Sequence, residues 1–231
     1  MKNIFYICLF ASMILPACSQ NSSPKVGFQA LDHEVVKIDD YVDANEYADY
    51  GVATFAGGCF WCTEAAFERI EGVVDVISGY SGGVKEFPTY REIGTGTLKH
   101  AEAIQVFYDK SKVDFDTLLD VLFVAHDPTT LNRQGPDRGP QYRSAIYYHN
   151  NDQKKLIDKK IAYLTDKKKF ANPIVTEVAP YAKFWVAEGY HQNFYELNPN
   201  QSYVRNVSRP KVEKVIETFP TLLKERYKVK P

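Results

Sequence analysis

One change of pattern, from a strand to a helix, constrains the fold of this chain most. Residues 49–58 (DYGVATFAGG) form an apolar run that ends at two glycines, which predicts a buried strand. Residues 62–72 (CTEAAFERIEG) carry apolar side chains at helical spacing and end at Gly72, a residue type common at helix C-termini. The sequence therefore predicts a strand, a tight turn and a helix, with Cys59 in the turn.

Strands and helices alternate along the rest of the chain. Further strands are predicted over residues 73–83, 101–109, 143–150 and 173–180, and helices over residues 113–126 and 151–170. This alternation predicts an α/β or α+β two-layer sandwich, in which helices pack on a sheet. The long segment 127–141, punctuated by Gly and Pro, is expected to be functional, because long loops inside compact domains usually are.

The charge pattern gives no sign of a nucleic-acid-binding surface. The formal net charge is −1, with 28 Lys and Arg against 29 Asp and Glu. The Lys-rich residues 154–170 also carry Leu156, Ile157, Ile161 and Leu164 at roughly helical spacing. We therefore expect an amphipathic helix with a solvated basic face, and no nucleic-acid partner.

The N-terminus has the pattern of a secretory signal. Lys2 is followed by an apolar run that ends at LPAC (residues 15–18) and is short for a membrane span. This end resembles a bacterial lipobox, in which the cysteine carries lipid, although Pro16 departs from the usual small residue. We expect residues 1–17 to be a lipoprotein signal peptide and Cys18 to be the lipid attachment site. An uncleaved anchor, or a plain signal cut nearby, is the alternative.

This processing has consequences for location and for the cysteines. It predicts an extracytoplasmic, membrane-anchored bacterial lipoprotein, on the periplasmic face or at the outer membrane, with residues 18–50 as a tether and wrapping segment. Of the four cysteines, Cys8 leaves with the signal and Cys18 is used by the lipid. Only Cys59 and Cys62 then remain in the folded domain.

Cys59 and Cys62 are best explained as a redox pair. Two cysteines do not supply the four ligands of a structural zinc site, and the five histidines are scattered, so no bound metal is expected. A disulfide that closes so short a loop adds little stability. Free N–H groups and the positive dipole end at a helix N-terminus are expected to lower the pKa of Cys59 and make it the nucleophile. Cys62, one turn further on, is placed as its resolving partner.

These residues alone leave three classes of function open. The first is a thioredoxin-like, membrane-anchored disulfide oxidoreductase. The second is an enzyme in which Cys59 attacks a sulfur atom of a small molecule or side chain. The third is a non-enzymatic lipoprotein. Phe60 and Trp61 lie between the cysteines, whereas a thioredoxin-type motif usually places its Trp before the first cysteine. The two aromatic side chains either pack in the core or line an apolar pocket beside the nucleophile.

Several motifs together resemble one family. GCFWC, GYSGG, PTYREIGTGTLKHAEA, HDPTTLNRQGPDRGPQYRSAIYY and AEGYHQNFYELNPNQSY occur in order over residues 52–203 and resemble the A-type peptide-methionine (S)-sulfoxide reductase family. The resemblance implies a reductase domain over residues 51–205, with a mixed sheet, packed helices, a ferredoxin-like core and irregular wrapping termini. Residues 206–231 are then a C-terminal tail.

The resemblance also implies roles for individual residues. Cys59 matches the nucleophile, and Phe60 and Trp61 match the aromatic pair that receives the methyl group of the sulfoxide. Glu102 matches the acid that protonates the sulfoxide oxygen, and Tyr90 and Tyr142 match the tyrosines that reach this oxygen. Asp137 matches an acid that binds the substrate amide. Glu102 shares a predicted strand face with Ile104 and Val106, so its burial is plausible, although the strand pattern alone favours an exposed residue.

The resemblance further implies the substrate and the partners. The expected substrate is methionine S-sulfoxide, in oxidised proteins or free. The expected electron donor is thioredoxin or a thioredoxin-like protein, with no bound cofactor and a monomeric enzyme. Many relatives carry resolving cysteines in the tail, whereas this chain has Val204 there and no cysteine after Cys62. The resolving role, and a Cys59–Cys62 disulfide, therefore fall to Cys62 by elimination.

Overall fold

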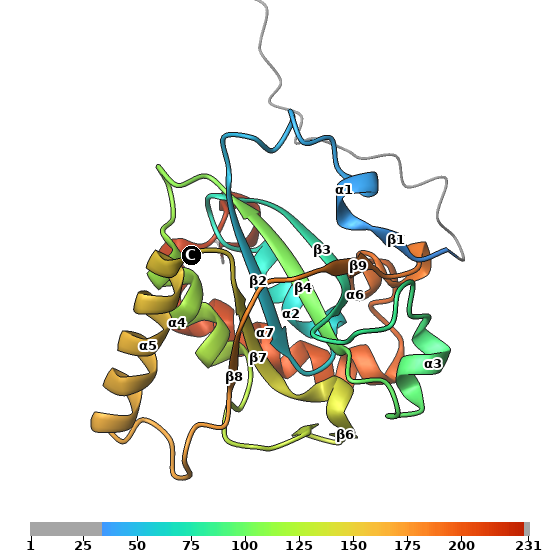
Figure 1. The fold of residues 1–231 in the computed structure, drawn as a ribbon. Coiled ribbons are helices and arrows are strands. Elements are labelled where there is room, and N and C mark those ends of the chain that lie inside the picture. The colour runs from blue at the N-terminus through green and yellow to red at the C-terminus, as the bar shows by residue number, and fades with distance from the viewer. Residues whose placement is uncertain (1–33, 229–231) are drawn as a thin grey trace, which may run out of the picture.

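The computed structural model describes residues 34–228, so the predicted signal peptide and the predicted lipid site at Cys18 lie outside the described residues. A seven-stranded sheet forms the centre of the molecule (Figure 1). Its strands are β1 (Val36–Lys37), β2 (Gly51–Gly57), β3 (Val73–Ser81), β4 (Ala101–Tyr108), β7 (Ser144–Tyr148), β8 (Glu177–Pro180) and β9 (Phe184–Val186). They lie in the order β1-β9-β3-β4-β2-β7-β8.

The central strands have the ferredoxin-like arrangement. Along the chain, α2 (Phe60–Glu68) follows β2, and α4 (Phe115–Ala125) follows β4. In the sheet the order is β3-β4-β2-β7, and every neighbouring pair is antiparallel. β8 joins β7 in parallel, which makes the whole sheet mixed. The predicted α+β fold with a ferredoxin-like core is confirmed.

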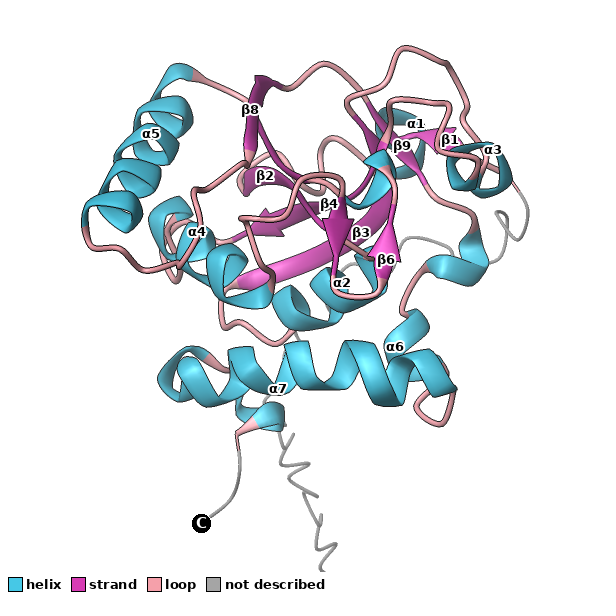
Figure 2. Cartoon of the chain, turned by 90° about the horizontal axis from the view of Figure 1, so that it is seen from below, coloured by secondary structure: helices cyan, strands magenta, loops and turns pink. Residues whose placement is uncertain are grey.

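Helices cover one face of this sheet. α2 and α4 pack on the sheet, and α7 (Arg209–Thr218) packs against both of them (Figure 2). Phe55 of β2, Phe67 of α2 and Leu119 of α4 are fully buried in the core between the layers. Side chains alternate along β4, so that Ile104 and Val106 face these helices. Glu102 has the same parity and therefore points toward α2, as its position in the strand predicts.

The segment that precedes β2 covers the opposite face. It contains the short α1 (Ile38–Tyr41) and packs against the side of the sheet that carries Ala103 and Phe107. The Tyr47 ring lies 4.2 Å from the Phe107 ring, and its hydroxyl donates a hydrogen bond of 2.7 Å to Asp75. This is the wrapping role expected of the N-terminal segment.

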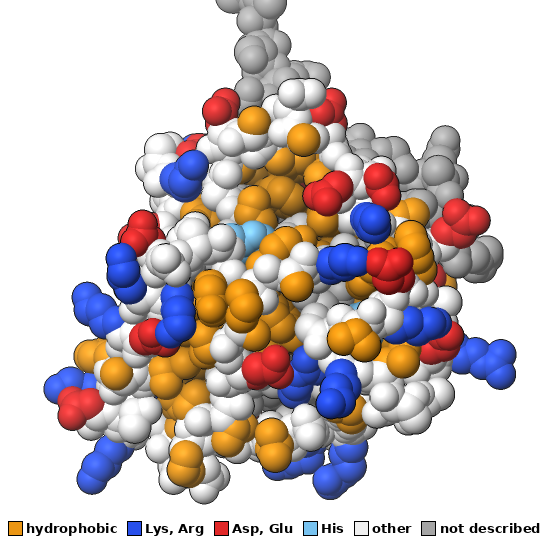
Figure 3. Space-filling model, viewed as in Figure 1, with side chains coloured by type: hydrophobic (Ala, Val, Ile, Leu, Met, Phe, Trp, Pro, Cys, Tyr) orange, Lys and Arg blue, Asp and Glu red, His pale blue; other side chains and the backbone are white. Residues whose placement is uncertain are grey.

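The predicted Lys-rich helix is α5 (Asn151–Asp166). Ile157 and Leu164 are buried, while pairs such as Lys154 with Asp158 lie exposed on its outer side. Blue and red side chains intermingle along the left edge of Figure 3, where α5 lies, so the amphipathic helix is confirmed.

The C-terminal tail is more regular than the sequence indicated. Residues Val204–Ser208 form a π-helical turn that continues directly into α7. Val212 and Val215 of α7 are buried against the helix layer. The sequence predicts no element here, because only a few apolar residues interrupt a charged stretch. Within residues 34–228, no helix is long and apolar enough to cross a lipid bilayer.

Several of the remaining short elements lie around the site. They are α3 (Tyr90–Gly94), α6 (Phe194–Leu197), the two-stranded β5 (Arg133–Gln134) and β6 (Asp137–Arg138), and a 3₁₀ turn over Pro140–Tyr142. β5, β6 and the 3₁₀ turn belong to the long segment that was expected to be functional.

Candidate active site

The nucleophile turn has the geometry that the glycines predict. β2 ends at Gly57 and α2 begins at Phe60, so Cys59 is the residue that caps the N-terminus of α2. Gly58 has a φ of +89°, and a Cβ at this position would lie 2.4 Å from Cγ of Gln134. Only glycine therefore fits both the backbone conformation and the close approach of the 127–141 segment.

The environment of Cys59 differs from the expectation in one respect. The side chain is 5% exposed, and the backbone N–H of Phe60 donates its hydrogen bond to Glu102 Oε2 at 3.1 Å. Burial, with the neighbouring Cys62 and Glu102, raises the pKa of the Cys59 thiol well above its usual value. The predicted lowering of this pKa is therefore wrong, because the sulfur is out of water and Glu102 takes the N–H group of Phe60 at the start of the helix.

Cys62 has the more favourable environment for a thiolate. It is 2% exposed, its thiol donates to Ser208 Oγ at 3.2 Å, and Lys211 Nζ lies 3.9 Å from its sulfur. The hydrogen bond with Cys59, the positive charge of Lys211 and the Ser208 hydroxyl outweigh burial and lower the pKa of Cys62 to about 7. Both cysteines are free thiols in this structure.

Glu102 is buried beside the nucleophile. Its side chain is almost inaccessible to solvent, and burial raises its pKa to about 8, although the Phe60 N–H hydrogen bond opposes this shift. The negative charge of Asp137 raises the pKa further. Glu102 is therefore largely protonated at neutral pH and can act as a proton donor.

The aromatic residues form an apolar wall next to Cys59. Phe60 is fully buried, and its ring lies 6.3 Å from that of Trp61 and stacks at 6.4 Å with that of Tyr90. The Trp61 indole stacks on Phe194 of α6 at 3.7 Å. Phe60 and Trp61 thus contact groups from distant segments, in agreement with a pocket wall built at the N-terminus of α2.

A hydrogen bond between Trp61 and the buried His191 fixes the orientation of this wall. Trp61 Nε1 donates to Nδ1 of His191 at 3.1 Å, which requires the proton of the neutral imidazole to be on Nε2. Burial lowers the pKa of His191 to about 4, so the ring is neutral at pH 7. Glu188 accepts hydrogen bonds from the Tyr80 hydroxyl at 2.8 Å and from the backbone N–H of Tyr90 at 2.9 Å.

Tyrosine hydroxyls surround the position of the reacting sulfur. Tyr90 and Tyr142 lie close to each other and to Glu102, and burial is the main cause that raises both of their pKa values. The Tyr203 hydroxyl donates to Asp137 and lies within hydrogen-bonding reach of Cys59. These neutral hydroxyls can stabilise charge that develops on an oxygen atom bound between them and Glu102.

The structure brings the predicted site residues of the described chain together, whereas Cys18 lies outside the described residues. Five further residues near the site were not predicted from the sequence: Tyr203, His191, Glu188, Ser208 and Lys211. The first three lie in the motifs AEGYHQ and NPNQSY, whose polar residues were the available signal. The other two lie beyond the resemblance, and no local pattern marks them.

Two thiols that contact each other can give up two electrons together, and so the fold and site define a cysteine-dependent oxidoreductase. No group of three His, Cys, Asp or Glu side chains within residues 34–228 has an arrangement that could hold a metal ion.

Comparison with known proteins gives the family. A family model described as peptide methionine sulfoxide reductase matches residues 51–222. The chain is 51% identical over 173 residues to peptide methionine sulfoxide reductase MsrA 1 of Rhodopirellula baltica, which covers 75% of this chain and 89% of the relative. It is 50% identical over 167 residues to MsrA of Haloquadratum walsbyi, covering 72% of this chain and 95% of the relative.

Solved structures agree with this result. The reduced form of Mxr1 from Saccharomyces cerevisiae matches with a TM-score of 0.60 and 37% identity, over 67% of this chain and 88% of that chain. Methionine sulfoxide reductase A of Corynebacterium diphtheriae matches with a TM-score of 0.60 and 34% identity, over 66% of this chain and 77% of that chain. The chain belongs to the peptide methionine sulfoxide reductase family and is an oxidoreductase of its A type.

Proposed function

We propose that this enzyme reduces the S epimer of methionine sulfoxide, in proteins and as the free amino acid, to methionine. The observation that carries the proposal is the carboxyl group of Glu102, which is buried beside Cys59 and has a pKa raised to about 8. A sulfoxide oxygen must be protonated before it can leave sulfur, and a protonated carboxyl group at this place supplies the proton.

In the first step the Cys59 sulfur attacks the sulfoxide sulfur while Glu102 protonates the oxygen. The hydroxyls of Tyr90 and Tyr142 stabilise the charge on that oxygen. Because burial raises the pKa of Cys59, polarisation of the S–O bond by these donors carries much of the reactivity. As the bond between the Cys59 sulfur and the substrate sulfur forms, the S–O bond of the substrate breaks. The protonated oxygen then bonds to Cys59 while the S–S bond breaks and its electron pair stays on the substrate sulfur. The products are methionine and a Cys59 sulfenic acid, so the substrate sulfur is reduced as Cys59 is oxidised.

Three fixed positions make the site selective for one epimer. The oxygen is held toward Glu102, the methyl group lies against Phe60 and Trp61, and Cys59 attacks from the third direction. The rest of the methionine residue then has one remaining direction, toward Asp137 and the exit of the pocket, where the Asp137 carboxylate binds the substrate amide.

The test is a kinetic assay on separated S and R epimers, with and without thioredoxin. Equal rates on both epimers would overturn the proposal.

Regeneration uses the second cysteine. The sulfenic acid on Cys59 condenses with the Cys62 thiol to give a disulfide and water. A dithiol reductant, thioredoxin or a thioredoxin-like protein, then reduces the disulfide by thiol exchange. The contact between the two thiols and the buried position of both support this pairing. The enzyme then works without a bound cofactor.

Replacing Cys62 with serine is expected to separate the two steps. Cys62→Ser should still convert about one equivalent of sulfoxide, because the nucleophile is intact, but steady-state turnover with thioredoxin should fall by about tenfold or more. Methionine release under single and multiple turnover measures both quantities. Sustained turnover at the wild-type rate would contradict the resolving role of Cys62.

The thioredoxin-like alternative predicts a different substrate. An insulin-disulfide reduction assay, run beside the sulfoxide assay, separates the two functions. Activity on insulin alone would favour the alternative, whereas family membership and the Glu102 geometry favour the sulfoxide.

We also propose that the enzyme acts outside the cytoplasm, anchored by lipid on Cys18, and that its donor is an extracytoplasmic thioredoxin-like protein. The signal pattern over residues 1–17 supports this location. Cys18→Ala, followed by cell fractionation, is expected to release the protein from the membrane fraction. An unchanged membrane fraction would contradict lipidation at Cys18.

A further inference from the structure

The C-terminal helix supplies the polar partners of Cys62. Ser208 ends the π-helical turn and is fully buried, with its hydroxyl 3.2 Å from the Cys62 sulfur. Lys211 lies in the first turn of α7, with Nζ 3.9 Å from the same sulfur. A serine hydroxyl can accept from a thiol or rotate to donate to a thiolate, so it fits Cys62 in both states.

The π-helical turn makes this arrangement possible. Tyr203 and Ser208 are five residues apart, a spacing that leaves side chains about 140° apart around an α-helix. In a π-helix the hydrogen bonds run between residues five apart, and such residues lie on one side of the helix. The same helix can therefore direct Tyr203 toward Cys59 and Ser208 toward Cys62.

Charged and titratable groups from several elements face Cys62. Lys211 of α7 is the cation that stabilises its thiolate. Asp137 of β6 opposes this effect, while Glu102 of β4 is largely protonated near neutral pH. Cys59 and Tyr203 complete the set. Lys211 thus supplies the positive charge that offsets the burial of the sulfur.

We propose that Ser208 and Lys211 are positioning residues that keep Cys62 ready to ionise, so that Cys62 is both the sulfur that attacks oxidised Cys59 and the sulfur that leaves when the disulfide is reduced. This inference rests on the proposed function, since it assumes that Cys62 resolves the sulfenic acid. It explains how this chain works without a tail cysteine: the tail contributes a cation and a hydroxyl to Cys62.

Both steps balance. In the first, the Cys62 thiolate forms a bond to the Cys59 sulfur, the S–O bond of the sulfenic acid breaks, and the hydroxyl leaves as water after taking one proton from solvent. In the second, a thiolate of the thioredoxin-like dithiol attacks Cys59, and Cys62 leaves as a thiolate beside Lys211. Thiols that ionise readily leave faster, so the mixed disulfide forms on Cys59.

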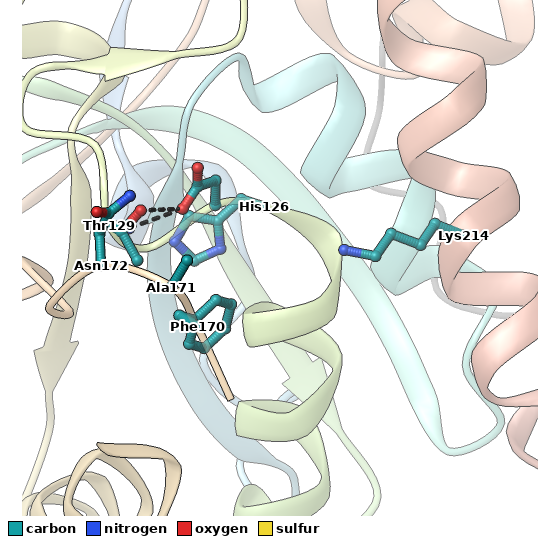
Figure 4. A pocket seen from close by; sticks show the side chains of 7 residues that line it. His126, Thr129, Phe170, Ala171, Asn172 and Lys214 are labelled. Atoms are coloured by element: carbon teal, nitrogen blue, oxygen red, sulfur yellow. Dashed lines mark hydrogen bonds between the residues drawn. The ribbon is translucent and has the colours of Figure 1, made fainter. Parts of the chain in front are cut away.

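The test compares three lysine variants of α7. Lys211→Met removes the cation, Lys211→Arg keeps it, and Lys214→Met removes a cation one turn further on. Lys214 reaches from α7 toward a pocket of about 310 Å³ whose lining contains no predicted site residue (Figure 4). Lys214→Met therefore controls for the loss of one positive charge from the same helix. Ser208→Ala tests the hydroxyl.

The measurement is a single turnover of the reduced enzyme with a methionine sulfoxide peptide, quenched with an alkylating reagent. Released methionine reports the first step, and mass spectrometry of the remaining thiols reports the disulfide. Losing the cation is expected to move the pH midpoint of disulfide formation upward by about one unit. At pH 7 the thiolate fraction of Cys62 should then fall by about fivefold, which, partly offset by higher nucleophilicity, should slow disulfide formation by about twofold.

The variants are expected to differ in the pH midpoint and the rate of disulfide formation. Lys211→Met should show the shifted pH midpoint, whereas Lys211→Arg and Lys214→Met should behave as wild type, and Ser208→Ala should slow the same step. With a thioredoxin that lacks its second cysteine, the trapped mixed disulfide should map to Cys59. If Lys211→Met keeps the wild-type midpoint, or if the trap maps to Cys62, the inference is wrong while the proposed function stands. If the wild type releases no methionine, or forms no disulfide, the proposed function fails as well.

Discussion

Replacing Cys59 with serine is expected to lower kcat/KM for methionine sulfoxide by about 10⁴-fold or more. The reaction needs an atom that attacks sulfur and then accepts oxygen, and a serine hydroxyl does neither under these conditions. Glu102, which faces position 59, is itself largely protonated and so cannot act as a base for a serine hydroxyl. Methionine release in a single turnover measures the loss.

Serine has nearly the shape of cysteine, so the fold should survive this change. A thermal midpoint close to that of the wild type, measured by circular dichroism, is the control. Cys62→Ser is the matched control variant. It removes the neighbouring thiol and should still reduce about one equivalent of sulfoxide. If Cys59→Ser retained more than a few per cent of the first-turnover rate, Cys59 could not be the nucleophile.

Replacing Glu102 with glutamine is expected to lower the rate of the first step by about 10²- to 10³-fold, the range for loss of a positioned general acid. Glutamine keeps an oxygen that can accept from the Phe60 N–H group, so the local backbone should be retained. It has no acidic proton to donate to the sulfoxide oxygen. The loss should therefore appear in the rate constant for methionine release more than in substrate binding.

The protonation state of Glu102 also predicts how the rate of the first step depends on pH. The raised pKa of about 8 means that Glu102 is protonated, and active as a donor, below this pH and loses its proton as the pH rises through it. The wild-type first step should therefore fall above about pH 8, measured in single turnovers so that the reductant plays no part. Glu102→Gln should lack this fall.

Glu64 of α2 offers a matched control for Glu102. It is another buried glutamate whose pKa burial raises, and its Oε1 accepts from the backbone N–H of Asn193 at 3.0 Å. Glu64→Gln is expected to keep the first-step rate within a few-fold and to retain the fall above pH 8. Equal losses in both variants would indicate a general effect of buried carboxyl groups and would contradict the donor role of Glu102.

Local sequence patterns predicted much of the fold. The apolar run before Gly57 and the helical spacing after Cys62 predicted the strand, the turn and α2 in their observed order. The predicted helix end at Gly72 is wrong, because α2 ends at Glu68 and Ile70 forms an isolated β-bridge with Leu223. Alternation along β4 placed Glu102 on the face that points toward α2. The C-terminal helix was missed, because its buried side, represented by Val212 and Val215, is narrow and its length is short.

The sequence by itself indicated the cysteine pair and the glycine turn, because both are features of neighbouring residues. The tertiary structure alone decided how these residues are ionised. The pKa of Cys59 rises where the helix N-terminus predicts a fall, since the fold excludes water from the thiol and Glu102, from another strand, occupies the Phe60 N–H group. The pKa of Cys62 falls because of its hydrogen bond with Cys59 and because Lys211 and Ser208 approach it from a segment about 150 residues away along the chain. Ionisation depends on the charges and solvent around a group, and packing between distant segments sets both.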